Sequence, residues 1–146
     1  MIRFNRVNDN AKLPVKGTSK SAAFDLHSSE NVMIEPRSRQ LVCTGLKLDD
    51  CPDDTYLRIA PRSSLAVKGI DVGAGVVDSD YRGKVKVLVI NTTDEVYQVC
   101  VHDRIAQLIP EALTPNTYCT IVGEENSTDD PFLRETRGEG GFGSTD

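Results

Sequence analysis

Short stretches in which apolar and polar residues alternate constrain the fold of this chain more than any other feature of its sequence. Side chains at every second residue fall on one face of a strand, so each stretch predicts a strand with one buried face. Turn residues separate the stretches at intervals of about 10 residues, which is typical of an all-β sandwich or barrel. The alternating apolar residues are Ile2 and Phe4, Val32 and Ile34, Leu41 and Cys43, Leu46 and Leu48, Leu57 and Ile59, and Val85, Val87 and Val89.

The chain divides into a strand-rich part and a glycine-rich arm. Residues 1–122 carry the predicted strands and at most one short helix, at residues 63–68, which a serine would cap and Gly69 would end. Residues 123–146 are rich in glycine and charge and predict a flexible arm. Two interpretations of this arm stay open: a solvated tail, or a flap whose backbone N–H groups, Arg137 and Phe142 close over a phosphate-bearing ligand.

Charge and hydropathy limit the partners of the chain. Seventeen Lys and Arg against 22 Asp and Glu give a net charge of −5, which disfavours nucleic acid. The sequence has no apolar run of the roughly 20 residues that a spanning helix needs, and its first residues do not resemble a secretory signal. We therefore expect no interaction with a membrane and a cytosolic or nuclear location. The cysteines form no C-x-x-C pair and are expected to be reduced, buried core residues rather than zinc ligands: Cys43, Cys51, Cys100 and Cys119.

Residues 73–83 form the densest group of candidate functional residues. Their pattern looks like a β-hairpin with a polar tip, and the glycines would leave backbone edges open to a flat ligand. Asp78 follows two valines, where a carboxylate can orient and deprotonate a water molecule. A turn-capping role for Asp78 and a surface position for Tyr81 stay open.

Three further segments place polar groups between apolar neighbours. Residues 61–66 lie at a predicted strand-to-helix junction, which suits either an anion site or a helix cap with an exposed arginine. Asp25 is either a structural hydrogen-bond acceptor or a metal partner. Arg104 and Gln107 lie in a strand-like run that is compatible with a buried salt bridge and a polar spacer.

The order of these segments resembles the homotrimeric dUTPase family over essentially the whole chain. The five family motifs occur as A-A-F-D-L (22–26), P-R-S-S-L-A (61–66), G-V-V-D-S-D-Y-R-G (75–83), D-R-I-A-Q-L (103–108) and R-G-E-G-G-F-G-S-T (137–145). The resemblance implies a jelly-roll-like (β-clip) subunit, a homotrimer with active sites shared between subunits, and Mg²⁺-dependent hydrolysis of dUTP to dUMP and pyrophosphate. Such an enzyme lowers dUTP, which prevents uracil incorporation into DNA, and supplies dUMP for dTTP synthesis.

The resemblance also implies a role for each matching residue. Asp78 matches the base that activates water for attack at the α-phosphate, and Asp25 matches the aspartate that holds magnesium through water. The phosphate-binding positions match Arg62, Ser63, Ser64, Gln107, Arg137, Gly143, Ser144 and Thr145. The uracil and deoxyribose positions match Gly75, Val76, Val77, Tyr81, Lys86 and Phe142.

Three residues depart from the usual family pattern. Ser64 stands where the family usually has glycine, Lys86 where several relatives have glycine, and Phe24 replaces a common tyrosine. Ser64 adds a side chain beside the phosphates. Lys86 must direct its stem away from the base if its backbone is to read uracil. None of the three removes a catalytic group.

Three other functions compete for the same residues. A dCTP deaminase shares the fold but needs a glutamate in the strand after the hairpin, where this chain has Leu88. A nucleotide sensor that acts through partner proteins would keep the site but would not need a base. A structural jelly roll explains the strands but not the polar set of Arg62, Asp78, Gln107 and Arg137.

Overall fold

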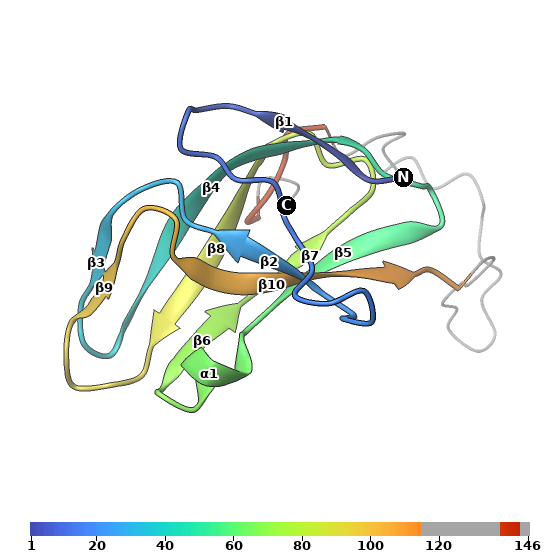
Figure 1. The fold of residues 1–146 in the computed structure, drawn as a ribbon. Coiled ribbons are helices and arrows are strands. Elements are labelled where there is room, and N and C mark those ends of the chain that lie inside the picture. Colours follow the sequence, from blue (N-terminus) through green and yellow to red (C-terminus); the bar gives the residue numbers. More distant parts are fainter. Residues whose placement is uncertain (115–137, 144–146) are drawn as a thin grey trace, which may run out of the picture.

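The fold consists of two four-stranded antiparallel sheets and a small two-stranded sheet (Figure 1). It is a computed structural model that describes residues 1–114 and 138–143. The first sheet has the order β1 (Arg3–Arg6), β4 (Ser38–Asp50), β8 (Lys84–Asn91) and β6 (Ile70–Gly73). The second has the order β2 (Phe24–His27), β10 (Arg104–Ala112), β5 (Thr55–Ala60) and β7 (Val76–Val77), and the third pairs β3 (Val32–Ile34) with β9 (Tyr97–Val99).

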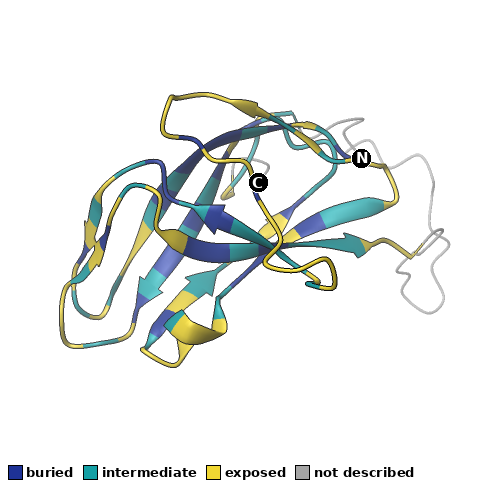
Figure 2. Ribbon diagram, in the orientation of Figure 1, coloured by how far each residue is buried: buried dark blue, intermediate teal, exposed yellow. Residues whose placement is uncertain are grey.

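The core lies between the two large sheets and is built from the alternating residues. Val87 and Val89 of β8 and Leu57 of β5 are almost completely buried and belong to one apolar cluster (Figure 2). Each such side chain contributes about 1.5–3 kcal/mol when it leaves water. The prediction of an all-β, jelly-roll-like fold is therefore confirmed as a sandwich, in which the described strands form separate sheets.

Strand β4 joins two stretches that the sequence presents as separate pairs of apolar residues. Its pairing with β8 shifts between Cys43 and Leu46, which is the mark of a β-bulge. Gly45 lies in this bulge with φ of 73°, and a Cβ there would lie 2.6 Å from the side-chain oxygen of Asn8. Glycine thus allows one long strand to bend and serve as the partner of both β1 and β8.

The predicted helix is present but shorter than expected. Helix α1 spans Ser63–Ala66, and Arg62 rather than a serine occupies its N-cap, without a capping hydrogen bond from its side chain. The backbone N–H groups of Leu65 and Ala66 instead bond to the carbonyl of Arg62. Gly69, with φ of 83°, follows the helix as predicted.

The expected burial of the cysteines is only partly correct. Cys51 is buried and Cys43 is half-buried, whereas Cys100 is exposed. Cys100 lies in the turn after β9, where its N–H group donates to the carboxylate of Asp103, so it takes no part in the core. Cys119 lies outside the described residues. In residues 1–114 and 138–143, no helix is both long and apolar enough to cross a membrane.

Candidate active site

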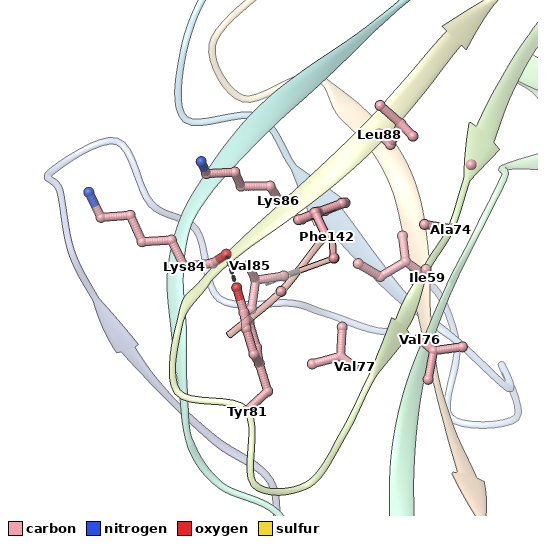
Figure 3. Close-up of a pocket in the computed structure, with 14 residues that line it drawn as sticks. Ile59, Ala74, Val76, Val77, Tyr81, Lys84, Val85, Lys86, Leu88 and Phe142 are labelled. Carbon is pink, nitrogen blue, oxygen red and sulfur yellow. Dashed lines mark hydrogen bonds between the residues drawn. The ribbon is translucent and has the colours of Figure 1, made fainter. Parts of the chain in front are cut away.

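The main concave feature of the described structure is a pocket of about 380 Å³ between β7 and β8 (Figure 3). It collects seven of the residues that the motifs single out, namely Gly75, Val76, Val77, Tyr81, Lys86, Phe142 and Gly143. The volume falls within the range of small-molecule sites, and apolar side chains form much of the wall. The pocket can therefore accommodate a flat, weakly polar ring whose edges form hydrogen bonds with backbone groups.

The segment that forms this pocket is not a simple hairpin. Strand β6 pairs with β8 in the first sheet, whereas β7 pairs with β5 in the second, through Leu57 and Arg58. The chain changes sheets at Ala74 and Gly75, which both have positive φ, 55° and 109°. The pocket is consequently lined by residues of both sheets, next to the point where the chain passes from one sheet to the other. The sequence prediction of a hairpin is corrected in this respect.

Tyr81 closes one end of the pocket. Its hydroxyl donates to the carbonyl of Lys84 at 3.1 Å, as the dashed line in Figure 3 shows, and its N–H group donates to the carbonyl of Asp78 at 3.1 Å. A Cβ on Gly83 would lie 2.3 Å from the Tyr81 hydroxyl, so only glycine leaves room for the ring. Asp78 lies in the turn directly after β7 and is not among the residues that line the pocket.

The glycine-rich segment 138–143, called the tail below, lies over the same pocket. The N–H group of Arg82 donates to the carbonyl of Gly138, and the Glu139 carboxylate pairs with the Lys47 ammonium. The hydrogen bond from Lys47 lowers the pKa of Glu139 below its ordinary value. Phe142 reaches the pocket with its side chain still 57% exposed. Arg137, Ser144 and Thr145 lie outside the described residues.

A second group of residues, called the Asp25 group below, consists of Asp25, Arg62, Arg104 and Gln107. Arg62 Nε donates to one carboxylate oxygen at 3.1 Å, and an Arg104 guanidinium nitrogen donates to the other at 3.4 Å. Gln107 is the cross-strand partner of Asp25 and donates to the carbonyl of Pro61 at 2.8 Å. This arrangement places two guanidinium groups and an amide around one carboxylate, a set suited to a polyphosphate with a hydrated cation.

The Asp25 group and the pocket have no residue in common. Asp25, Arg62, Ser63, Ser64 and Gln107 do not line the pocket. The two serines are exposed on α1.

The three departures have clear positions in the structure. Lys86 lies on the pocket side of β8, and Figure 3 shows that its ammonium extends away from Phe142 and Ile59. Its stem thus leaves the centre of the pocket free. Phe24 packs under Lys16, whose ammonium lies 5.1 Å from the ring centre, and Ser64 projects into solvent on α1.

Several pocket residues escaped the sequence analysis. Lys84 and Leu88 line the pocket beside Lys86, and all three share one face of β8 because a strand repeats every two residues. The alternation therefore contained the signal for these two positions. Ile59, Ala74 and Gly141 lie in segments that the sequence analysis singled out, but none was assigned to the ligand, and only the tertiary structure brings them together.

Comparisons with known proteins agree with the motifs. The family model described as dUTPase matches residues 9–146. A deoxyuridine 5'-triphosphate nucleotidohydrolase of Fowlpox virus is 48% identical over 143 residues, covering 96% of this chain and 93% of the relative. The enzyme of the same name from Yarrowia lipolytica is 44% identical over 141 residues, covering 95% of this chain and 85% of the relative.

Solved structures show the same fold at low sequence identity. A mutant dUTPase from phage phi11 of S. aureus, in which a structural Mg(II) ion is coordinated, superposes with a TM-score of 0.76 and 18% identity. The match covers 86% of this chain and 99% of the phage chain. At this level of identity the likeness concerns the fold.

Proposed function

Because the chain belongs to the dUTPase family, and is thus a dUTP nucleotidohydrolase, we propose that it cleaves dUTP to dUMP and pyrophosphate by attack of water at the α-phosphate. One observation carries the substrate assignment. All six residues expected to contact uracil and deoxyribose line a single pocket, although they come from β7, the following turn, β8 and the tail. The product dUMP would supply dTTP synthesis, and the loss of dUTP would keep uracil out of DNA.

The pocket supports recognition of a deoxyuridine. The main chain around Gly75 to Val77 can donate to and accept from the edge of the base, as uracil recognition requires. Tyr81 would pack under the sugar, where its ring leaves little room for a 2′-hydroxyl. Phe142 would stack on the base, a contact worth about 1–3 kcal/mol in single-strand nucleic-acid binders.

The Asp78 carboxylate is proposed as the base. It lies in the turn between Val77, which lines the pocket, and Tyr81, which would hold the sugar. A base at this point is placed to orient a water molecule beside the α-phosphate of a nucleotide whose sugar rests on Tyr81.

The Asp25 group is proposed to hold the triphosphate and Mg²⁺. Magnesium usually keeps several waters and takes one or two carboxylates together with substrate phosphates, and Asp25 provides such a carboxylate beside two guanidinium groups. The bound ion would neutralise charge on the phosphate oxygens. Phosphate contacts would come from Arg62, Ser63, Ser64, Gln107, Arg137, Gly143, Ser144 and Thr145.

A homotrimer with shared sites is part of the same proposal, and it rests on the resemblance to the family. Because no residue of the Asp25 group lines the pocket, we propose that a complete site combines the pocket of one subunit with the Asp25 group of another. The division into a domain of residues 1–122 and an arm of residues 123–146 belongs to the same proposal, as does a cytosolic or nuclear location.

Two rival functions are weighed against the same pocket. Leu88 lines it, and its aliphatic side chain cannot carry the proton that deamination of cytosine needs. A sensor would bind dUTP without turning it over.

The test is pyrophosphate release from dUTP, dTTP, dCTP and UTP with Mg²⁺. We expect turnover of dUTP alone; binding without turnover would favour the sensor, and ammonia release from dCTP the deaminase.

A further inference from the structure

The ammonium groups of three lysines beside the pocket have no role in the proposed chemistry, in which Lys86 acts through its backbone. Lys47 of β4 and Lys84 of β8 are direct cross-strand partners, and Lys86 follows two residues along β8. Together they line a second hollow of about 310 Å³, which Glu139, Gly141 and Phe142 of the tail also line. Like charges placed directly opposite each other in a sheet repel, so this pair favours an anion between or beside them.

The tail supplies that anion. The Glu139 carboxylate forms an ion pair with Lys47, and Lys84 lies close enough to add a favourable charge interaction. The Lys47 side chain is 32% exposed and the Glu139 side chain 70% exposed, so the pair lies at the surface. Its strength is accordingly modest and sensitive to salt.

The described contacts of the tail other than the ion pair involve the turn after β7 and the pocket. Gly138 is held by backbone contacts to Tyr81 and Arg82, both on the turn after β7. Phe142 is more than half exposed and has φ of 50°, a conformation that costs free energy for a residue with a side chain. The Glu139–Lys47 pair ties the segment to a different element, β4, and so fixes its direction across the pocket.

We propose that Lys47 and Glu139 are positioning residues that hold the tail across the pocket and set how readily Phe142 closes over the base. This inference rests on the proposed function in one respect: closure of the tail affects dUTP turnover only if the chain hydrolyses dUTP. The pair touches no reacting atom, and it acts by raising the fraction of the protein in which the tail lies in place.

The kinetic test uses Lys47→Met, Glu139→Gln and the double variant, with Asp94→Asn as a matched control that breaks the exposed Arg37–Asp94 pair at 2.8 Å. We expect each single variant and the double variant to raise KM for dUTP by about two- to five-fold, with kcat nearly unchanged. The exchanged pair Lys47→Glu with Glu139→Lys should recover most of the loss. Additive effects of the two single changes, or a KM equal to that of the wild type, would overturn the proposal.

A second measurement does not depend on turnover. The chain contains no tryptophan, so Phe142→Trp introduces a single fluorescent reporter at the pocket. Without nucleotide, acrylamide should quench this tryptophan more strongly when Glu139→Gln is added to the Phe142→Trp variant. A concentration of 0.5 M NaCl should have the same effect on Phe142→Trp alone, because it shortens the screening length to about 4 Å. Quenching that ignores both changes would refute the positioning role, even if dUTP hydrolysis were never observed.

Discussion

The backbone of Ile59 packs directly against Gly75 at the point where the chain crosses from one sheet to the other. The Ile59 N–H group donates to the Gly75 carbonyl at 2.7 Å, and a Cβ on Gly75 would lie 2.4 Å from the carbonyl oxygen of Ile59. Gly75 also has φ of 109°, which L side chains rarely adopt. The close approach of these two segments, both of which line the pocket, thus depends on the absence of a side chain at Gly75.

Replacement of this glycine gives the first prediction. Gly75→Ala should destabilise the fold by about 1–3 kcal/mol through backbone strain, and it should weaken dUTP binding further because β7 must move away from β5. Urea denaturation and a nucleotide titration measure the two effects. Gly17→Ala is the control, because a Cβ there meets its nearest atom at an ordinary 3.7 Å. Unchanged stability and binding in Gly75→Ala would contradict the packing argument.

The base assignment is tested by Asp78→Asn. The amide keeps the size of the carboxylate but cannot accept the proton of the attacking water, so turnover should fall by about 10²–10⁴-fold. Binding of dUTP, measured by calorimetry in the same variant, should survive. Asp80→Asn, two residues further along the same turn, serves as the control. Full activity in Asp78→Asn would remove this residue from the base role.

Removal of the tail tests the flap interpretation. A chain that lacks residues 137–146 loses Arg137, Phe142 and the Glu139 anchor, and its kcat/KM for dUTP should fall by at least about 100-fold. Far-ultraviolet circular dichroism and light scattering should show an intact fold and an unchanged assembly. An unchanged kcat/KM would identify the segment as a solvated tail.

Asp25→Asn tests the proposed contact with hydrated magnesium. Groups that hold a metal's ligands in place typically change its apparent affinity by 10–100-fold, so half-maximal turnover should need about ten-fold more Mg²⁺. Asp49→Asn is a suitable control, since that carboxylate pairs with Arg3 and Asn5 at the far edge of the first sheet. The same Mg²⁺ requirement in wild type and Asp25→Asn would rule out the water-mediated role.

The pH dependence of stability should include a contribution from Glu111. Hydrogen bonds from Tyr56 and then Arg58 lower the pKa of this carboxyl group in the folded protein. A lowered pKa stabilises the fold fully above the unfolded value of about 4.3 and loses that effect as the pH falls through the folded value. Glu111→Gln should therefore be less stable than wild type at pH 6, and the difference should disappear toward pH 3. A constant difference in urea denaturation across this range would exclude the ionised carboxylate as its cause.

Alternation in the sequence predicted β1, β3, β4, β5 and β8, but it did not predict β6 or β7. Val85, Val87 and Val89 are all nearly buried in β8, as their spacing indicates. The two residues of β7 are too few to show a period. The partner of β7 is set by the crossing at Ala74 and Gly75, and local pattern carries no information about which sheet a strand joins.

In the site, too, the sequence predicted residues in contiguous motifs but not contacts between residues far apart in the chain. Motifs identified the residues of the pocket because each motif is contiguous, and the structure brings the described ones together. The Lys47–Glu139 pair had no such signal, since its members are separated by 92 positions and neither is unusual in its own segment. Only the fold shows that β4 carries the tail's anchor.

The proposed division of the site between the pocket and the Asp25 group has a genetic consequence. A chain with a damaged pocket still offers a sound Asp25 group, and a chain with a damaged Asp25 group still offers a sound pocket. If subunits share sites as proposed, mixed assemblies of two individually inactive chains contain some whole sites. Two recessive alleles of this one gene should then complement each other, and refolding Tyr81→Ala together with Asp25→Ala should regain activity that neither variant has alone.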